Sequence, residues 1–257
     1  MSRHGTPSEA RHHKVAFCLS PSTSITILAG GGGLTGTLSM NRSAILDRVG
    51  TEVPDFVTHY YRRTRRPFLN LSDLTDDEAI EVMRELIDER RHGLQHRPFG
   101  RKYLDMRRAT EDRLREMFVA AGGRPERSSP HYFVLGESPW FRGLATDMAE
   151  LRIAVASLPE DQTTVTWADS FGVTLVTRDF GLNYRPRPYH GKLYRLSDIP
   201  ALVARYGLYM VDADDYQGLA EGLPTTASEP FVEVQLWSDE PTRPFLGTDN
   251  SAGHDAR

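Results

Sequence analysis

The segment Pro130–Phe141, PHYFVLGESPWF, gathers residue types that could perform acid–base chemistry. In a strand, His131 shares a face with Phe133, where its imidazole could orient a ligand hydroxyl, act as a general base, or serve as a hydrogen-bonded core residue. Glu137 follows in a turn beside Trp140. Apolar neighbours raise the pKa of a carboxyl group, which suits an acid or a base, whereas a solvated turn residue would have no such role.

A second group of residues, RPRPYHGKLYR at Arg185–Arg195, combines arginines with aromatic side chains. Its prolines extend the backbone and spread the arginines apart. Arginine forks bind phosphate or carboxylate groups, and a tyrosine ring offers a stacking surface. We therefore expect ligand-binding residues at Arg178, Arg185, Tyr189 and Arg195 and a catalytic candidate at His190. The alternative is a solvated basic loop.

The strand-like segment Phe231–Trp237, FVEVQLW, alternates apolar and polar side chains. One face carries Val232, Val234 and Leu236, and the other carries Phe231, Glu233, Gln235 and Trp237. The second face is either the wall of a cleft or the outer face of a half-buried antiparallel strand, and simple alternation favours the outer face. Glu233 is nevertheless the fourth catalytic candidate.

Three of these features can be taken together: a His-Tyr pair on one strand, the sequence Tyr-His-Gly from Tyr189, and a glutamate on a late strand. They loosely resemble the His/Tyr/Glu arrangement of ADP-ribosyltransferase-like folds, which bind NAD. The resemblance covers isolated residues and no continuous motif. It implies that His131 or His190 holds the ribose, that tyrosines stack on the nicotinamide and that Glu233 orients the nucleophile. The sequence itself identifies no cofactor.

No metal site is expected. His92 and His96 have i,i+4 spacing, but Gly93 lies between them where a helix should end. His131, His190 and Glu233 could form a two-His-one-carboxylate site only if the strands bring them together. The motifs G-x-S-x-G, H-E-x-x-H and C-x-x-C are absent, so no nucleophile is identified.

Nucleic acid is the alternative partner, through the run Tyr60–Pro67, YYRRTRRP, in which four arginines follow two tyrosines. Such a run could grip a phosphate backbone. The carboxylates of Asp73, Asp76, Asp77 and Glu78 follow closely and favour a locally salt-bridged surface instead. A net charge of -4 and a pI near 6.1 give the whole molecule no preference for polyanions.

Cysteine usage and hydropathy predict the compartment. Cys18 is the only cysteine, which excludes an internal disulfide and a thiolate zinc site and favours a reducing environment. No apolar run approaches the roughly 18 residues that cross a bilayer. We expect a soluble cytoplasmic protein with no membrane partner. Only three of its 31 cationic residues are lysine, a bias typical of high-GC bacterial genomes.

These residues must be positioned by two different kinds of structure. Residues 1–40, with four consecutive glycines from Gly30, are expected to be a flexible leader, and the composition shift makes Met40 a candidate initiator. Residues 41–123 have a helical signal. Thr75 and Glu78 form a capping-box pattern for a helix that ends at Gly93, and a second helix from about Arg101 to Ala121 should pair with it in antiparallel fashion.

Residues 130–238 have period-two and β-branched patterns. The expected strands are His131–Leu135, Glu150–Leu158, Thr163–Trp167, Gly172–Thr177, Lys192–Leu196 and Phe231–Trp237. One short helix, capped by Ser197 and ended by Gly207, interrupts them, and residues 239–257 should form a flexible tail.

The predicted fold is therefore α+β, a helical N-terminal part followed by a mostly antiparallel sheet with one short helix. The predicted function is a small-molecule enzyme or ligand-binding protein, or alternatively a non-catalytic interaction protein acting through Tyr60–Arg66. The sequence predicts no oligomeric state.

Overall fold

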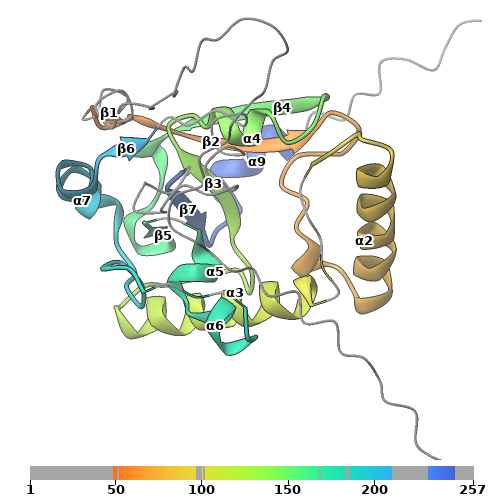
Figure 1. The fold of residues 1–257 in the computed structure, drawn as a ribbon. Helices are drawn as coiled ribbons and strands as arrows, with labels where there is room; N and C mark the ends of the chain where they lie inside the picture. The colour runs from red at the N-terminus through yellow and green to blue at the C-terminus, as the bar shows by residue number, and fades with distance from the viewer. Residues whose placement is uncertain are drawn as a thin grey trace, which may run out of the picture. The chain divides into compact units, whose positions relative to one another are not determined.

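A five-stranded antiparallel sheet forms the centre of the protein, with the strand order β4-β2-β3-β7-β5 (Figure 1). The computed structural model describes residues 49–50, 52–96, 100, 102–167, 169–182, 184, 186–209 and 231–246. The expected leader, residues 1–40, lies outside them. The strands are β2 (Phe56–Arg62), β3 (His131–Leu135), β4 (Met148–Ala154), β5 (Thr163–Thr166) and β7 (Glu233–Leu236). The predicted α+β class is confirmed, and β3 is the central strand of the sheet.

Helices surround the sheet, and a small antiparallel ribbon joins β1 (Val49–Gly50) to β6 (Leu208–Tyr209). The α-helices are α2 (Asp76–Arg91), α3 (Tyr103–Ala120), α4 (Pro139–Arg142), α5 (Ser170–Val173), α6 (Val176–Asp179), α7 (Ile199–Tyr206) and α9 (Arg243–Leu246). The 3-10 turns are η1 (Leu71–Asp73), η2 (Val155–Ser157), η3 (Glu160–Gln162), η4 (Leu196–Asp198) and η5 (Glu240–Thr242). Among the described residues, no helix has the length and hydropathy needed to cross a bilayer.

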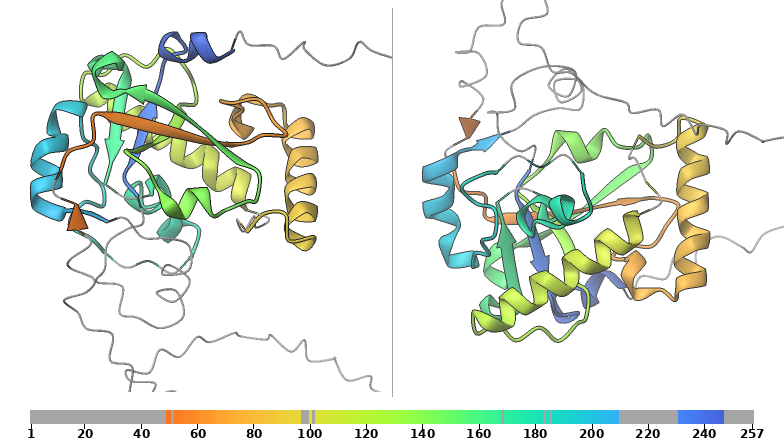
Figure 2. Two further views of the ribbon diagram at one scale, coloured as in Figure 1. Left: turned by 90° about the horizontal axis from the view of Figure 1, so that it is seen from above. Right: turned by 60° about the horizontal axis from the view of Figure 1, so that its bottom comes forward.

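The two faces of the sheet differ in polarity. Residues paired across antiparallel strands point to the same face. One face therefore collects the main hydrophobic core, to which α7 contributes. Its members include Val57, Phe133, Leu135, Val165, Val234, Leu236, Ile199, Leu202 and Val203. The opposite face carries polar side chains, and α3 lies across it (Figure 2). There Leu114 and Phe118 pack on Trp237.

The two long helices form as predicted, but they do not pair. The Thr75–Glu78 capping box begins α2, and Gly93 follows its end. On α2, Ala79 and Met83 are buried, whereas Ile80 is 44% exposed. α2 and α3 do not run side by side in any view, so the expected antiparallel helix pair is wrong (Figures 1 and 2).

Several predicted strands differ from the structure. β2 lies inside the region expected to be helical, and Gly172–Thr177 forms α5 and the start of α6. Helical turns form there instead of a strand because Asp169 accepts a hydrogen bond from the Phe171 N–H at the start of α5. Leu175, with a φ of 66°, then turns the chain between α5 and α6. Lys192–Leu196 contributes only the isolated bridge of Tyr194 to Val165.

Smaller corrections concern the ends of elements. The strand expected to reach Leu158 ends at Ala154 and continues as η2. Ser197 does not cap α7, because its N–H and hydroxyl both donate to Glu160. Residues 130–238 contain several short helices rather than one, and residues 239–246, expected in a flexible tail, form η5 and α9. Residues 247–257 lie outside the described part of the chain.

Candidate functional site

The sheet splits at its centre, between β2 and β3. These strands pair only at Val57 with Leu135 and at Thr58 with Val134. Beyond Thr58, β2 continues to pair with β4 as far as Arg62, while β3 continues with β7. The two strands therefore diverge in space (Figure 1). Backbone groups that would pair in a continuous sheet must find other partners at this split.

His59 supplies one of those partners. Its Nδ1–H donates to the carbonyl oxygen of Tyr132 at 2.9 Å, and its Nε2 accepts from the Phe68 N–H at 3.0 Å. A carbonyl only accepts and an N–H only donates, so the imidazole is neutral with its proton on Nδ1. Burial lowers the pKa of His59 to about 4. Phe68 stacks on the ring with centroids 4.3 Å apart and has a φ of 59°, a backbone conformation that is costly for a bulky residue.

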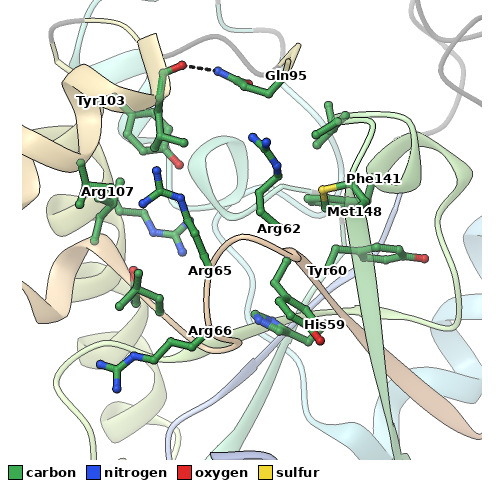
Figure 3. Close-up of a pocket in the computed structure, with 18 residues that line it drawn as sticks. His59, Tyr60, Arg62, Arg65, Arg66, Gln95, Tyr103, Arg107, Phe141 and Met148 are labelled. Carbon is green, nitrogen blue, oxygen red and sulfur yellow. Dashed lines mark hydrogen bonds between the residues drawn. The ribbon is translucent and has the colours of Figure 1, made fainter. Parts of the chain in front are cut away.

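Two adjoining cavities lie beside the split. The first, with a volume of about 230 Å³, is here called the arginine cavity because Arg62, Arg65, Arg66 and Arg107 line it (Figure 3). The second, of about 150 Å³, is called the glutamate cavity because Glu233 is its lining carboxylate. Both cavities share the six lining residues His59, Tyr60, Leu69, Asn70, Arg107 and Phe141. They can therefore hold two parts of one molecule.

Arg107 lies at the junction of the cavities. Although only 9% of the residue is exposed, its Nε alone is bonded, to Glu111 at 2.7 Å. The guanidinium carbon lies 3.5 Å from the centroid of the Tyr132 ring. Within the described ranges, neither terminal nitrogen has a hydrogen-bond partner. A largely buried arginine whose two terminal nitrogens have no partner in the described ranges is suited to binding an anion.

Glu111 is itself held by three donors. One of its carboxylate oxygens accepts from Arg107, from the Tyr132 hydroxyl at 3.1 Å and from the Asn70 amide at 3.4 Å. Burial raises the pKa of Tyr132 well above its usual value, so its hydroxyl stays protonated and donates. This network fixes the Nε side of the Arg107 guanidinium, and the residue lines both cavities.

The other arginines are held more completely. Arg62 is paired with Asp147 and, at 2.9 Å, with Glu89, while Arg65 is paired with Glu85 at 2.9 Å. Figure 3 shows Arg66 pointing away from the cavity. The Tyr60–Arg66 run thus agrees with the salt-bridged interpretation, although its partners come from α2 and the segment before β4 rather than from Asp73–Glu78.

Glu233 is the titratable carboxyl group that lines the glutamate cavity. The residue is 8% exposed, and its Oε2 accepts from the Ser170 N–H at 2.9 Å and from the Gln235 amide at 3.3 Å. In the part of the chain that the structure describes, Oε1 has no hydrogen-bond partner. Burial, reinforced by the negative charge of Asp169, raises the pKa of Glu233 to about 7 despite the opposing charge of Arg107.

A chain of buried hydrogen bonds supports this carboxyl group. Gln235 donates to Thr166 at 2.8 Å and accepts from Thr164 at 2.9 Å, and the Trp237 indole donates to Thr164 at 3.0 Å. Gln235 and Trp237 are fully buried. The expectation that this face of FVEVQLW is an outer face is therefore wrong, because α3 covers it. The polar network holds Glu233 in one position.

His131 also lines the glutamate cavity, on the opposite face of the sheet from Glu233. Its Nε2–H donates to Asp239 at 2.8 Å, and burial lowers its pKa. Its Nδ1 is buried and has no partner among the described residues. Two of the four catalytic candidates, His131 and Glu233, are thus brought to one cavity.

The other predicted site residues that the structure describes line neither cavity. Glu137 is a solvated turn residue paired with Arg142 and Arg152. His190 accepts from the Arg187 N–H, and Tyr189 is buried against Tyr206. Arg178 pairs with Asp179, Arg195 donates to the carbonyl of Ala121, and Arg185 lies outside the described residues. The expected arginine-rich loop therefore does not join His131 and Glu233 in one site.

The sequence interpretation missed Arg107 and Glu111, although a signal for both exists. Leu114 and Phe118 belong to the buried stripe of α3; Arg107 precedes Leu114 by seven residues, and Glu111 precedes Phe118 by seven. This spacing places both charges on the buried helix face. An ion pair with i,i+4 spacing on the buried face of a helix therefore indicates a candidate functional site.

Comparison with protein-family models, curated proteins and solved structures yields no match for this chain. The described residues contain no cluster of three His, Cys, Asp or Glu side chains that could hold a metal ion. The function is therefore inferred from the residues of the site. They combine donors that can bind an anion, apolar walls and a carboxyl group whose pKa is raised to about 7.

Proposed function

We propose that the protein binds a small molecule with an anionic group and an apolar body in the arginine and glutamate cavities. The observation that carries this proposal is the state of Arg107. Its charge is buried and balanced by Glu111, yet both terminal nitrogens lack partners among the described residues. A carboxylate or phosphate bound by this fork would satisfy both donors.

The walls of the arginine cavity support an apolar body. Apolar side chains from α2, from the segment before β4 and from the first residue of β4 line it, including Val82, Leu86, Leu144 and Met148, together with the Phe141 ring. Small-molecule sites in proteins typically combine such apolar walls with a few placed polar groups. The two volumes suit a compact ligand with one ring or a short chain.

NAD is retained as a candidate ligand of which the nicotinamide and ribose alone would occupy cavities of these volumes. His131, Tyr132 and Glu233 line one cavity, as the resemblance to ADP-ribosyltransferase-like folds implies, whereas His190 does not join them. The alternative of a nucleic-acid contact through Tyr60–Arg66 gains no support from the contacts, because the carboxylates of Glu89 and Glu85 hold Arg62 and Arg65.

We also propose that the protein works in the reducing cytoplasm of a high-GC bacterium. Its single cysteine, Cys18, and its low ratio of lysine to arginine support this.

The test is calorimetric and thermal-shift titration with inorganic phosphate, benzoate, octanoate, phenylpyruvate, AMP and NAD. Removing Arg107 alone would leave Glu111 buried and unpaired, which costs about 3–5 kcal/mol. The informative variant is therefore the double change Arg107→Gln and Glu111→Gln. It should bind the best probe at least about tenfold more weakly, since a charge-assisted fork contributes about 1.5–3 kcal/mol.

Arg84→Gln is the matched control. Arg84 is 72% exposed on its side chain and pairs with Glu81 on α2, away from both cavities. The control should bind as the wild type does. Equal affinity of the double variant and the wild type for every probe would contradict the proposed function.

A further inference from the structure

We infer that Glu233 exchanges a proton with the bound molecule, and that the molecule is a 2-oxo acid whose carbonyl oxygen and carboxylate face Arg107. This inference rests on the proposed function and adds to it a reaction and a substrate class. It follows from the position of the free carboxylate oxygen, from the groups that surround it and from the shape of the adjoining cavities.

The position of Glu233 is the first step. One oxygen is fixed by the Ser170 N–H and the Gln235 amide, the other has no partner in the described ranges, and the residue lines the glutamate cavity. A carboxylate that served only the fold would satisfy both oxygens, because an unpaired buried charge is costly. The free oxygen is thus available to a bound molecule.

The charged and titratable groups around Glu233 are the second step. Arg107 approaches from α3, Tyr132 from β3, and Asp169 from the residues that lead into α5. Asp169 favours the protonated form of Glu233 and Arg107 favours the ionised form. A carboxyl group balanced between its two forms near neutral pH can both remove and return a proton.

The proposed reaction is proton removal next to a carbonyl group, with Glu233 as the base and the Arg107 guanidinium as the group that stabilises the resulting negative charge. The C–H bond next to the ligand's carbonyl breaks, and its proton moves to the free oxygen of Glu233. The electron pair moves to the carbonyl oxygen, which accepts a hydrogen bond from a terminal nitrogen of Arg107. The proton on Glu233 then exchanges with solvent water, and return of a solvent-derived proton to carbon completes the exchange, whereas transfer of the proton from Glu233 to the oxygen gives the enol. Neither step needs a co-reactant.

The substrate class follows from the two cavities. A 2-oxo acid places two oxygen-bearing groups side by side, and these match the two terminal nitrogens of Arg107. Its acidic carbon can then lie in the glutamate cavity while an apolar substituent occupies the arginine cavity between α2 and Phe141. Phenylpyruvate has this composition and is the principal probe.

The experiment measures deuterium incorporation into phenylpyruvate, pyruvate and 2-oxobutyrate in D2O by proton NMR, with buffer alone as the blank. The wild-type protein should accelerate exchange next to the carbonyl of at least one of them. Glu233→Gln keeps the size of the side chain and an acceptor for Ser170. The variant should bind the same probe with a dissociation constant within about threefold of the wild-type value. It should lose at least about 99% of the acceleration, because removal of a general base typically slows a reaction about a hundredfold or more.

A second variant tests whether the carboxyl group itself titrates in the reaction. Asp169→Asn removes the neighbouring negative charge, so the midpoint of the pH–rate profile should move to lower pH while the maximal rate is retained. A purely structural role of Glu233 would not produce this shift. An unchanged midpoint would overturn the assignment of the titrating group.

The outcomes separate this inference from the proposed function. Binding of a 2-oxo acid without accelerated exchange of any of the three, or acceleration that persists in Glu233→Gln, overturns the inference and leaves the proposed function standing. Binding of phosphate, benzoate or octanoate but of no 2-oxo acid also overturns the inference alone. Failure of every anionic probe to bind overturns both.

Discussion

At the residue scale, His59 gives the fold a defined pH dependence. The folded protein holds the imidazole neutral with a pKa of about 4, whereas in the unfolded chain the pKa is near 6.5. The unfolded state therefore takes up the proton first as the pH falls. The stability that His59 contributes is complete above pH 6.5 and is lost progressively toward pH 4, by about 3 kcal/mol in total.

The measurement compares urea unfolding of the wild type and His59→Gln between pH 7 and pH 4. Comparison with the variant is needed because Glu233 has the opposite effect. Its pKa is raised in the folded protein, so its contribution to the stability of the folded state increases as the pH falls. The variant should be less stable than the wild type at pH 7, because it has lost the imidazole hydrogen bonds to Tyr132 and Phe68. As the pH falls from 7 to 4, its free energy of unfolding should decrease less steeply than that of the wild type. Parallel curves for the two proteins would show that His59 is not held neutral.

At the scale of elements, α2 limits the positive charge of the arginine cavity. Glu89 lies 2.9 Å from the Arg62 guanidinium and 3.5 Å from that of Arg65. Glu89→Gln should leave both arginines more available and tighten the binding of benzoate about two- to fivefold at low salt, the effect of a partly exposed charge. Calorimetric titration at 20 mM and 500 mM NaCl checks this, because salt should remove the gain.

Glu81→Gln is the control for that change, since it removes the same charge from α2 but from a pair with exposed Arg84. The control should leave benzoate affinity unchanged. Equal tightening in both variants would show a general effect of net charge rather than a local effect at the cavity.

The elements also show what the sequence could predict. The Thr75–Glu78 box located α2, and alternation located β3 and β7, because these signals are local. β2 was missed because its alternating residues lead directly into an arginine run that resembles a solvated segment. The site was missed for another reason. Arg107 and Glu233 meet only through the packing of α3 across β7, and the cavity exists only because β2 and β3 diverge, which no local pattern encodes.

At the scale of the whole molecule, the split makes the sheet two units joined by a narrow seam. β4 and β2 pair over seven residues, and β3–β7 and β7–β5 over four each, whereas β2 and β3 share two residue pairs and the adjoining hydrogen bond from the Gly136 N–H to the Phe56 carbonyl. A ligand at this seam contacts both units, since the cavities are lined by Tyr60 from β2 and by Tyr132 from β3. Binding should therefore stabilise the junction itself.

Hydrogen exchange measured by mass spectrometry tests this consequence. At about 100 times its dissociation constant, a ligand adds roughly 2.7 kcal/mol to the stability of the state that binds it, which slows exchange through opening of that state about 100-fold. Amides of Phe56–Arg62 and His131–Leu135 should gain protection together, because separating the two units destroys the site. The same probe should give no such gain in the double variant Arg107→Gln and Glu111→Gln. Protection that appeared on only one side of the seam would place the ligand outside it, since a molecule bound between β2 and β3 cannot stabilise one strand alone.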